Sequence, residues 1–222
     1  DRKQYLEVKK ALELIGGKWK GGKIAGFVFK TNPTELLKNI AVNANVNLKK
    51  KFQFFATPPD LAERLVYYAD LQTHDVILEP SAGQGAIIKE INRQCDTVTP
   101  DCYELMEVNK LILNESELNF NLVGDDFLKS DNKEYSVIIA NPPFSKNQDI
   151  DHVYKMYDKL SRRGRIVTIM SKHWQKSKNK KETAFRNWLD GIDSEVIEVS
   201  AGEFKDSGTS IASVIVIINK SL

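Results

Sequence analysis

A short turn at residues 141–144 carries the side chains best suited to chemistry in this sequence. It reads Asn-Pro-Pro-Phe and follows an apolar run at 135–139 that is typical of a short buried strand. Two consecutive prolines end a strand or helix and stiffen the chain that follows. A polar amide, backbone carbonyl groups and an aromatic ring are therefore presented together at the carboxyl end of a strand, where open α/β sheets bind ligands.

This turn has the groups needed to hold a flat molecule that carries an NH2 group. The side-chain oxygen of Asn141 and the carbonyl oxygen of Pro142 are suited to accept its two hydrogens, and the ring of Phe144 is suited to stack on its face. The alternative is a structural Pro-Pro loop whose phenylalanine packs in the core. A motif match is a hypothesis, so both interpretations stay open at this point.

A second candidate segment, residues 79–85, reads Glu-Pro-Ser-Ala-Gly-Gln-Gly and directly follows a predicted strand at 75–79. Glycines after a strand allow the backbone to approach a ligand, and the helix that follows offers its positive end. The carboxylate of Glu79 is suited to a ligand ammonium group. The third glycine of the dinucleotide-binding fingerprint is absent, because Ile88 stands at its position.

Two further strand ends carry candidate ligand groups. Glu104 ends a predicted strand at 98–104, about 20 residues beyond the glycine pair, where an acid commonly holds ribose hydroxyl groups. Asp126 and Phe127 follow a predicted strand at 119–123, and an acid beside an aromatic ring is suited to the amino group and ring of adenine. Together these segments place acidic or aromatic groups at consecutive strand ends, all on one edge of a sheet.

Thr57 stands at the start of a predicted helix, with Pro58 at its first helical position and Asp60 at the third. Two roles fit its side chain. It is a good N-cap for this helix, and with the free backbone N–H groups of the helix start it could hold a ligand carboxylate.

The elements that must position these groups alternate along the chain from His74 onward. Strands are predicted at 75–79, 98–104, 119–123, 135–141, 164–170, 195–199 and 212–219, with helices between them. This order predicts an α/β fold with a mostly parallel, doubly wound sheet.

The first 50 residues are predicted to form a separate small unit. A helix at 3–15 ends at Gly16-Gly17, two short strands follow at 18–20 and 25–29, and Asn32 caps a second helix. Gly17 to Lys23 formally fits a phosphate-binding loop, but Ile24 replaces the required Ser or Thr and a helix precedes it, so we reject that function. We predict two domains: a basic helix-hairpin-helix unit at 1–50 and the α/β domain at 51–222.

The charge of the chain is unevenly distributed. Of 222 residues with a net charge of +2, residues 1–51 contain 12 Lys and Arg against 4 Asp and Glu, a net of +8, which leaves −6 for the remainder. Residues 162–186 form a second basic zone. Basic zones on an acidic body favour contact with a polyanion, and the alternative is that these are solvated lysines on exposed faces.

Several classes of protein are disfavoured by composition. No apolar run is long enough to cross a membrane, and no signal peptide is visible, so we expect a cytoplasmic protein without membrane contact. Two cysteines make no disulfide framework. The three histidines, at 74, 152 and 173, lack metal-ligand spacing, so we predict no metal and only surface or packing roles. Trp19, Trp174 and Trp188 are predicted to be packing residues.

The glycine segment followed by the Asn-Pro-Pro-Phe turn resembles the S-adenosylmethionine-dependent N6-adenine DNA methyltransferases. Upstream, Phe55-Ala56-Thr57-Pro58 resembles the amino-terminal cofactor motif of that family, and this motif order is its γ arrangement. Residues 204–209, Phe-Lys-Asp-Ser-Gly-Thr, resemble a late motif that helps to enclose a flipped base. The resemblance covers residues 52–220.

The resemblance implies a Rossmann-like class I methyltransferase that uses S-adenosyl-L-methionine to methylate adenine in DNA. The implied cofactor-binding residues are Thr57, Glu79, Pro80, Ser81, Ala82, Gly83, Gly85, Glu104, Asp126 and Phe127. The implied catalytic residues are Asn141, Pro142, Pro143 and Phe144, and Phe204 would contact the target base. The second basic zone adds Lys172, Lys176 and Lys178 as candidate contacts to the substrate backbone.

Other functions share these motifs. RNA adenine methylases and the glutamine methylases that act on release factors also use an Asn-Pro-Pro-aromatic turn, since each target presents a planar NH2 group. A catalytically idle nucleic-acid-binding subunit of the same fold is a further alternative. Many family members carry a target-recognition domain after the late motif, and this sequence ends soon after it, so we expect a separate specificity subunit or a homodimer.

Overall fold

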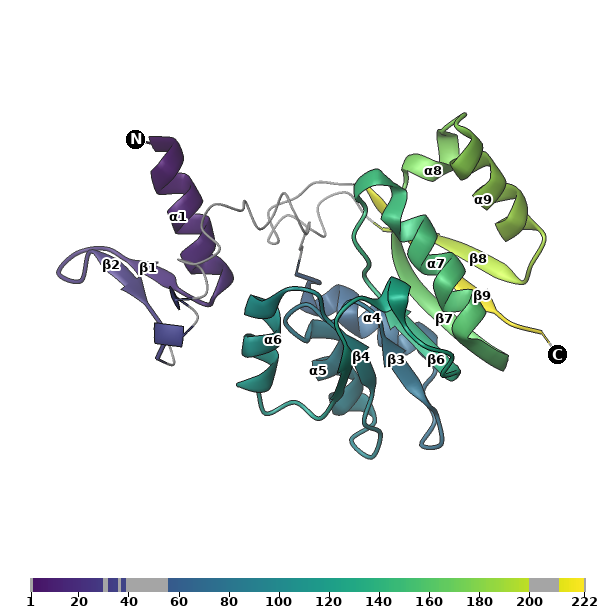
Figure 1. Ribbon diagram of the computed structural model, residues 1–222, viewed down its shortest axis with the longest axis horizontal. Helices are drawn as coiled ribbons and strands as arrows, with labels where there is room; N and C mark the ends of the chain where they lie inside the picture. Colours follow the sequence, from purple (N-terminus) through teal and green to yellow (C-terminus); the bar gives the residue numbers. More distant parts are fainter. Residues whose placement is uncertain (1, 30–31, 36, 39–55, 200–211, 222) are drawn as a thin grey trace.

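The structure, a computed structural model, describes residues 2–29, 32–35, 37–38, 56–199 and 212–221 (Figure 1). Its body is a seven-stranded sheet in the order β5-β4-β3-β6-β7-β9-β8. The strands are β3 (Ile77–Glu79), β4 (Asp101–Tyr103), β5 (Asn121–Gly124), β6 (Tyr135–Ala140), β7 (Leu160–Ser171), β8 (Ser194–Glu198) and β9 (Ser213–Asn219). The first five in this order pair in parallel, and β9 runs antiparallel to β7 and to β8. The predicted mostly parallel α/β sheet is confirmed.

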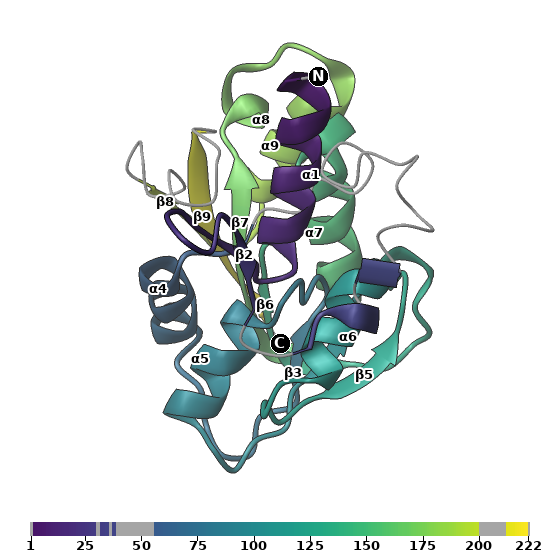
Figure 2. The same ribbon diagram turned by 90° about the vertical axis from the view of Figure 1, so that its left-hand side faces the viewer.

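Helices cover both faces of this sheet (Figure 2). They are α4 (Pro59–Ala69), α5 (Ala86–Gln94), α6 (Glu107–Asn114), α7 (Gln148–Lys159), α8 (His173–Lys176) and α9 (Lys180–Asp190), with 3-10 turns η1 (Phe127–Lys129) and η2 (Ser145–Asn147). In β6, Val137 and Ile139 join the core cluster under α4 and α5, while Ile138 and Ala140 join the cluster under α7 and α9. Successive side chains of a strand point to opposite faces, so a strand buried on both faces must be apolar throughout.

The amino-terminal unit packs against α6. It contains α1 (Arg2–Leu14) and an antiparallel hairpin of β1 (Lys18–Lys20) and β2 (Gly26–Val28). Leu12, Ile15 and Phe29 of this unit share a core cluster with residues of α6 and with Met106. Gly17 makes the turn possible, because a Cβ there would lie 2.7 Å from the carbonyl oxygen of Leu12. The predicted domain boundary at residues 50 and 51 lies outside the described residues.

The described helices include none that is both long and apolar enough to cross a membrane.

Candidate active site

A cavity of about 230 Å³ lies where the carboxyl ends of β3, β4, β5 and β6 meet. Its lining includes twelve of the predicted site residues: Thr57, Pro80, Ser81, Ala82, Gly83, Glu104, Asp126, Phe127, Asn141, Pro142, Pro143 and Phe144. Parallel strands place their carboxyl ends on the same edge, which is why segments far apart in the sequence converge here. Glu79 and Gly85 lie behind this wall, and Phe204 lies outside the described residues.

The glycine segment forms the floor of the cavity beside β3. Gly83 and Gly85 have φ angles of +57° and +82°, a conformation that side chains disfavour. A Cβ at Gly85 would lie 2.7 Å from Leu118 Cδ1 and 2.9 Å from Leu113 Cδ2. The loop is tied to β4, because the Ala82 N–H donates to the carbonyl oxygen of Tyr103 at 2.9 Å. Gly83 therefore serves the turn, and Gly85 also serves packing behind the cavity.

Glu104 joins this loop to the end of β4. Its Oε2 accepts a hydrogen bond from the Gly83 N–H and its Oε1 accepts one from the Met106 N–H, each at 2.6 Å. Burial raises the pKa of Glu104 above its usual value, although both backbone hydrogen bonds act in the opposite direction. Each carboxylate oxygen has a second lone pair, so these bonds leave capacity for ligand hydroxyl groups.

Glu79 lies beneath the loop with only 2% of its surface exposed. Its Oε2 is buried and has no hydrogen-bond partner among the residues that the structure describes. Burial first, and the nearby carboxylate of Glu104 second, raise the pKa of Glu79 well above its usual value. A buried polar atom without a partner is uncommon in a folded protein, and it marks Glu79 as a candidate ligand-binding group.

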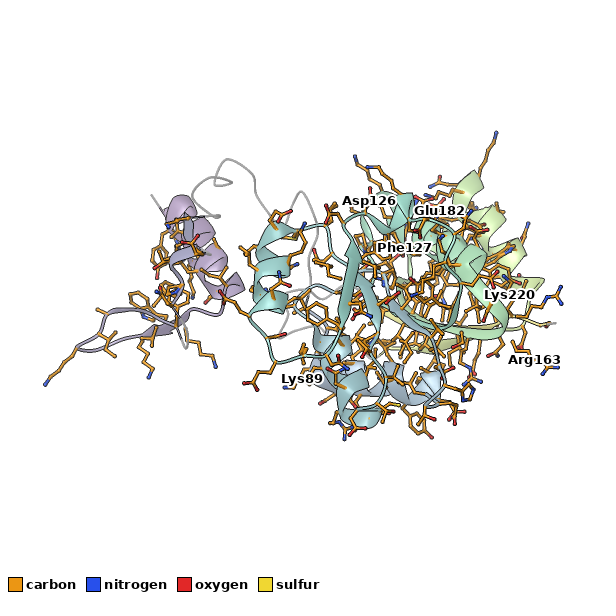
Figure 3. All side chains as sticks on the ribbon, turned by 60° about the horizontal axis from the view of Figure 1, so that its bottom comes forward. Lys89, Asp126, Phe127, Arg163, Glu182 and Lys220 are labelled. Carbon is orange, nitrogen blue, oxygen red and sulfur yellow. The ribbon has the colours of Figure 1, made fainter. Side chains whose placement is uncertain are left out.

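Asp126 and Phe127 form the wall after β5, where Figure 3 labels them side by side. The Phe127 ring is buried and lies edge-on to Tyr103, with centroids 5.6 Å apart. Asp126 Oδ1 accepts a hydrogen bond from the Leu128 N–H at 3.1 Å, so the side chain also caps η1. The exposed Lys129 pairs with the other oxygen of Asp126 at 3.0 Å.

His152 is a cavity residue that the sequence analysis left out of the site. It lines the wall from α7, its ring centroid lies 5.7 Å from that of Phe127, and its buried Nδ1 has no partner in the described part of the chain. Burial lowers the pKa of His152 to about 4, against the opposing charges of Asp126 and Asp151. Gln148 also lines the cavity, one helical turn before His152. This i, i+4 polar pair on the helix after the Asn-Pro-Pro-Phe turn is the sequence signal that could have found both.

The Asn141 side chain contacts a residue that lies 84 positions earlier in the chain. The Asn141 Nδ2 donates a hydrogen bond to Thr57 Oγ1 at 3.0 Å, which orients the amide. The prediction that Thr57 caps a helix is wrong: α4 begins at Pro59, its N-cap residue is Pro58, and no side chain caps it. Two prolines extend the chain before the first turn, so Thr57 lies one position too early. Phe144 lines the cavity and also packs against the core cluster under α4, so its ring has a packing contact, and stacking on a ligand stays a prediction.

The predicted substrate lysines lie outside the cavity around α8. Lys172 forms an ion pair with Glu198 of β8, while Lys176 and Lys178 are exposed. The predicted packing role is confirmed for Trp174, which is buried and lies edge-on to Phe185. Trp19 is 48% exposed, so the prediction that it serves only packing is wrong. Nowhere in the described ranges do three His, Cys, Asp or Glu side chains gather in a way that could hold a metal ion.

Comparison with curated proteins gives partial matches. No protein-family model matches the chain. It is 34% identical over 105 residues to "Ribosomal RNA small subunit methyltransferase A" of Thermotoga neapolitana, a match that covers 45% of this chain and 40% of the relative. It is 31% identical over 102 residues to an "rRNA methyltransferase" of Streptomyces thermotolerans, covering 44% of this chain and 33% of the relative. The chain thus spans less than half the length of these relatives.

Comparison with solved structures extends over more of the chain. The M protein of the type I restriction enzyme EcoKI has a TM-score of 0.63 at 13% identity, covering 99% of this chain and 54% of that chain. A dimethyladenosine transferase from Plasmodium falciparum has a TM-score of 0.55 at 17% identity, covering 75% and 64%. The plantazolicin methyltransferase BpumL, solved in complex with SAH, has a TM-score of 0.54 at 14% identity, covering 98% and 100%. At these identities the likeness establishes the fold, and that fold is the class I methyltransferase fold.

Proposed function

We propose that this protein transfers a methyl group from S-adenosylmethionine to the N6 amino group of adenine in DNA. One observation carries the proposal: a single cavity joins the Asn141 turn to the glycine segment, Glu104 and Phe127. The first group suits a planar amine, and the others suit a nucleoside with a charged tail. The fold shared with the M protein of a restriction enzyme supports DNA as the substrate.

S-adenosylmethionine fits the chemistry of the residues present. The unpartnered oxygen of Glu79 suits its ammonium group, and Glu104 suits its ribose hydroxyl groups. Asp126 and the Phe127 ring suit its adenine. Neighbours with this fold support the same cofactor, since BpumL was solved with SAH and a Listeria monocytogenes neighbour is described as S-adenosylmethionine-dependent. When bound, the cofactor supplies a methyl group on a sulfonium.

The role of the Asn141 turn follows from the target amine. The N6 lone pair of adenine is delocalised into the purine ring, so the amine is a poor nucleophile. Acceptance of both N–H hydrogens, by the Asn141 side chain and the Pro142 carbonyl, favours a more pyramidal nitrogen and stabilises the positive charge that forms there. The protein contributes orientation and fixed acceptors. The Thr57 hydrogen bond holds Asn141 ready for this role before substrate arrives.

Access requires the target base to leave its stack. A base inside a duplex cannot reach a cavity, so it must be flipped out or come from a single strand, and stacking on Phe144 offsets part of that cost. Both cysteines are buried free thiols, and direct transfer needs no covalent enzyme intermediate. The M protein is named as part of a restriction enzyme, which supports our expectation of a separate specificity subunit or a second copy of the chain.

The test is incubation of the protein with radiolabelled S-adenosylmethionine and, separately, DNA, RNA and protein, followed by digestion to identify the labelled unit. We expect label in N6-methyladenine from DNA, and loss of label with Asn141→Ala. Label in glutamine, or none in any substrate, would contradict the proposal.

RNA is the second candidate substrate, because the partial sequence relatives are rRNA methyltransferases. The two candidates differ only in the sugar and the surrounding strand, since the target amine is the same. The RNA arm of the same experiment separates them: label in methyladenosine with none in deoxyadenosine would select RNA.

A further inference from the structure

We propose that the β1–β2 hairpin is a stacking platform for an unpaired stretch of the nucleic-acid substrate. Trp19 would stack on a base, and the lysines at 18, 20 and 23 would contact phosphates. This surface lies outside the cavity and has no role in the proposed methyl transfer. The inference rests on the proposed function only for the class of polyanion that binds.

The hairpin exposes an aromatic ring that is held in place. All three residues of β1 are exposed, and Trp19 keeps 48% of its surface accessible. Trp19 lies directly opposite Phe27 in the strand register, and the two rings meet edge-on with centroids 5.3 Å apart and planes at 67°. An edge contact fixes the orientation of a ring without covering it, so a flat ligand can stack on Trp19 with little further ordering.

The cations around this ring are available. Within the described ranges, Lys18, Lys20 and Lys23 form no ion pair, whereas Lys9 pairs with Glu13 and Lys38 with Glu35. In β1, Lys18 and Lys20 alternate with Trp19, so they lie on the other face of the two-stranded ribbon, and a strand stacked on Trp19 would contact them around the edge of the ribbon.

Charge decides which partner fits this surface. Residues 1–51 carry a net of +8 and the rest of the chain −6, so the unit repels basic partners and attracts a polyanion. An exposed aromatic ring among lysines is the combination that binds single-stranded nucleic acid, where bases stack and phosphates pair. A duplex offers its phosphates but keeps its bases stacked on one another, so it uses only half of this surface.

The position of the hairpin connects it to the cavity. Leu12, Ile15 and Phe29 anchor the unit on α6 and on Met106, and Met106 also lines the cavity. The hairpin projects from this anchor away from the α/β domain (Figures 1 and 3). A strand bound there is therefore held on the α6 side of the α/β domain, outside the cavity.

The test measures binding of fluorescein-labelled single-stranded DNA and RNA, and of a duplex of the same length, to the full chain without a methyl donor. We expect single strands to bind more tightly than the duplex, and the tighter of the DNA and RNA arms identifies the natural strand. Trp19→Ala should weaken single-strand binding about tenfold, because one base stack is lost. Trp19→Phe keeps a ring against Phe27 and should lose less.

Two further measurements test the proposal even if Trp19→Ala disturbs the folding of the hairpin. Tryptophan fluorescence of the native chain should be quenched by the oligonucleotide, and Trp19→Phe should remove most of this quenching while retaining most of the affinity. A double variant, Lys18→Gln with Lys20→Gln, should lower affinity more than Lys89→Gln with Arg93→Gln, an equal loss of charge from exposed residues of α5 outside both basic zones.

Unchanged single-strand affinity in Trp19→Ala, or equal losses in the two double variants, would overturn the proposal. Because no methyl donor is present, these results do not depend on methylation. Failure of methyl transfer with intact Trp19-dependent binding would instead contradict only the proposed function.

Discussion

Two buried carboxylates on adjacent strands, one register position apart and on opposite faces of the sheet, contrast in how they are satisfied. Asp101, at the amino end of β4 and 5% exposed, accepts hydrogen bonds from Lys133 Nζ at 2.5 Å, Tyr135 OH at 3.0 Å and Asn121 Nδ2 at 3.2 Å. Glu79, at the carboxyl end of β3, keeps an oxygen with no partner in the described part of the chain. The first carboxylate is complete without a ligand and the second is not.

This difference teaches how to separate stability from function in the molecule. A buried charge needs partners, and Asp101 finds them within the fold. Glu79 is held behind the cavity wall, near a second acid, Glu104, an arrangement that costs stability unless a cation arrives. Substitution of Asp101 should therefore alter unfolding, and substitution of Glu79 should alter ligand binding and catalysis.

The largest expected effect is on catalysis and concerns Asn141, which directly follows β6. Asn141→Ala removes one of two fixed acceptors and should lower kcat about 100-fold to 1,000-fold, the usual cost of one preorganised group in a transition state. Affinity for S-adenosylhomocysteine, measured by calorimetry, should stay near that of the native chain. A matched loss of cofactor affinity would place Asn141 in the cofactor site instead.

The next largest effect is on the stability of the fold and concerns Asp101. Asp101→Ala leaves the Tyr135 hydroxyl without its acceptor and the Lys133 ammonium without its partner, and should lower the free energy of unfolding by about 2–3 kcal/mol. Urea unfolding measures this loss. Lys133→Gln, at a side chain that is half exposed, is the milder control. If Asp101→Ala leaves the free energy of unfolding unchanged, Asp101 does not stabilise the fold and the contrast with Glu79 is contradicted.

Glu79→Gln should weaken ligand binding without the loss of stability expected for Asp101→Ala. Affinity for S-adenosylhomocysteine should fall about tenfold or more, since a hydrogen bond to a charged ammonium is lost. Stability of the ligand-free protein should stay the same or rise, because the substitution removes a buried carboxylate. If Glu79→Gln lowers the free energy of unfolding as much as Asp101→Ala does, both carboxylates stabilise the fold and the contrast is contradicted.

The pH dependence of stability sharpens this prediction. A folded-state pKa above the ordinary 4.5 means that the folded protein retains a proton that the unfolded chain releases, so the stability contributed by Glu79 is lost as pH rises from 4.5 through the raised pKa. Glu79→Gln removes this loss, and its stability advantage over the native chain should grow with pH. Affinity of the native chain for the ligand ammonium should rise over the same range. A constant difference between the two proteins would contradict the shifted pKa.

The smallest expected effect concerns the support of Asn141. Thr57→Val keeps the volume of the side chain but removes the acceptor for Asn141 Nδ2, and should lower kcat about fivefold to tenfold, the worth of one neutral hydrogen bond. Thr57→Ser retains the hydroxyl and is the matched control. Equal kcat values for the two variants would show that the hydrogen bond does not support catalysis.

Local signals were sufficient for most elements of the fold. The strand predicted at 135–141 runs from Tyr135 to Ala140 in the structure, and the last strand, predicted at 212–219, runs from Ser213 to Asn219. The apolar run of β6 and the prolines after it predicted a strand that ends in a stiff turn. Such signals work because side-chain periodicity and proline geometry are properties of neighbouring residues.

Contacts between residues that lie far apart in the sequence were harder to predict. Thr57 looked like a helix cap because its neighbours are proline and aspartate, yet its hydroxyl accepts a hydrogen bond from Asn141, 84 positions away. His152 shows no metal-ligand spacing in the sequence, and only the packing of α7 brings its ring against Phe127. Trp19 looked like a core residue by type, and only the two-stranded form of its sheet leaves it exposed.

The sequence by itself determined the alternation of strands and helices, the apolar strands buried on both faces, and the chemical types of the groups at each strand end. Tertiary structure decided which of these groups share a cavity, which carboxylate is left without a partner, and which aromatic ring faces solvent. The physical reason is range: backbone preferences act over a few residues, whereas partners and burial depend on which elements pack together across the whole sheet.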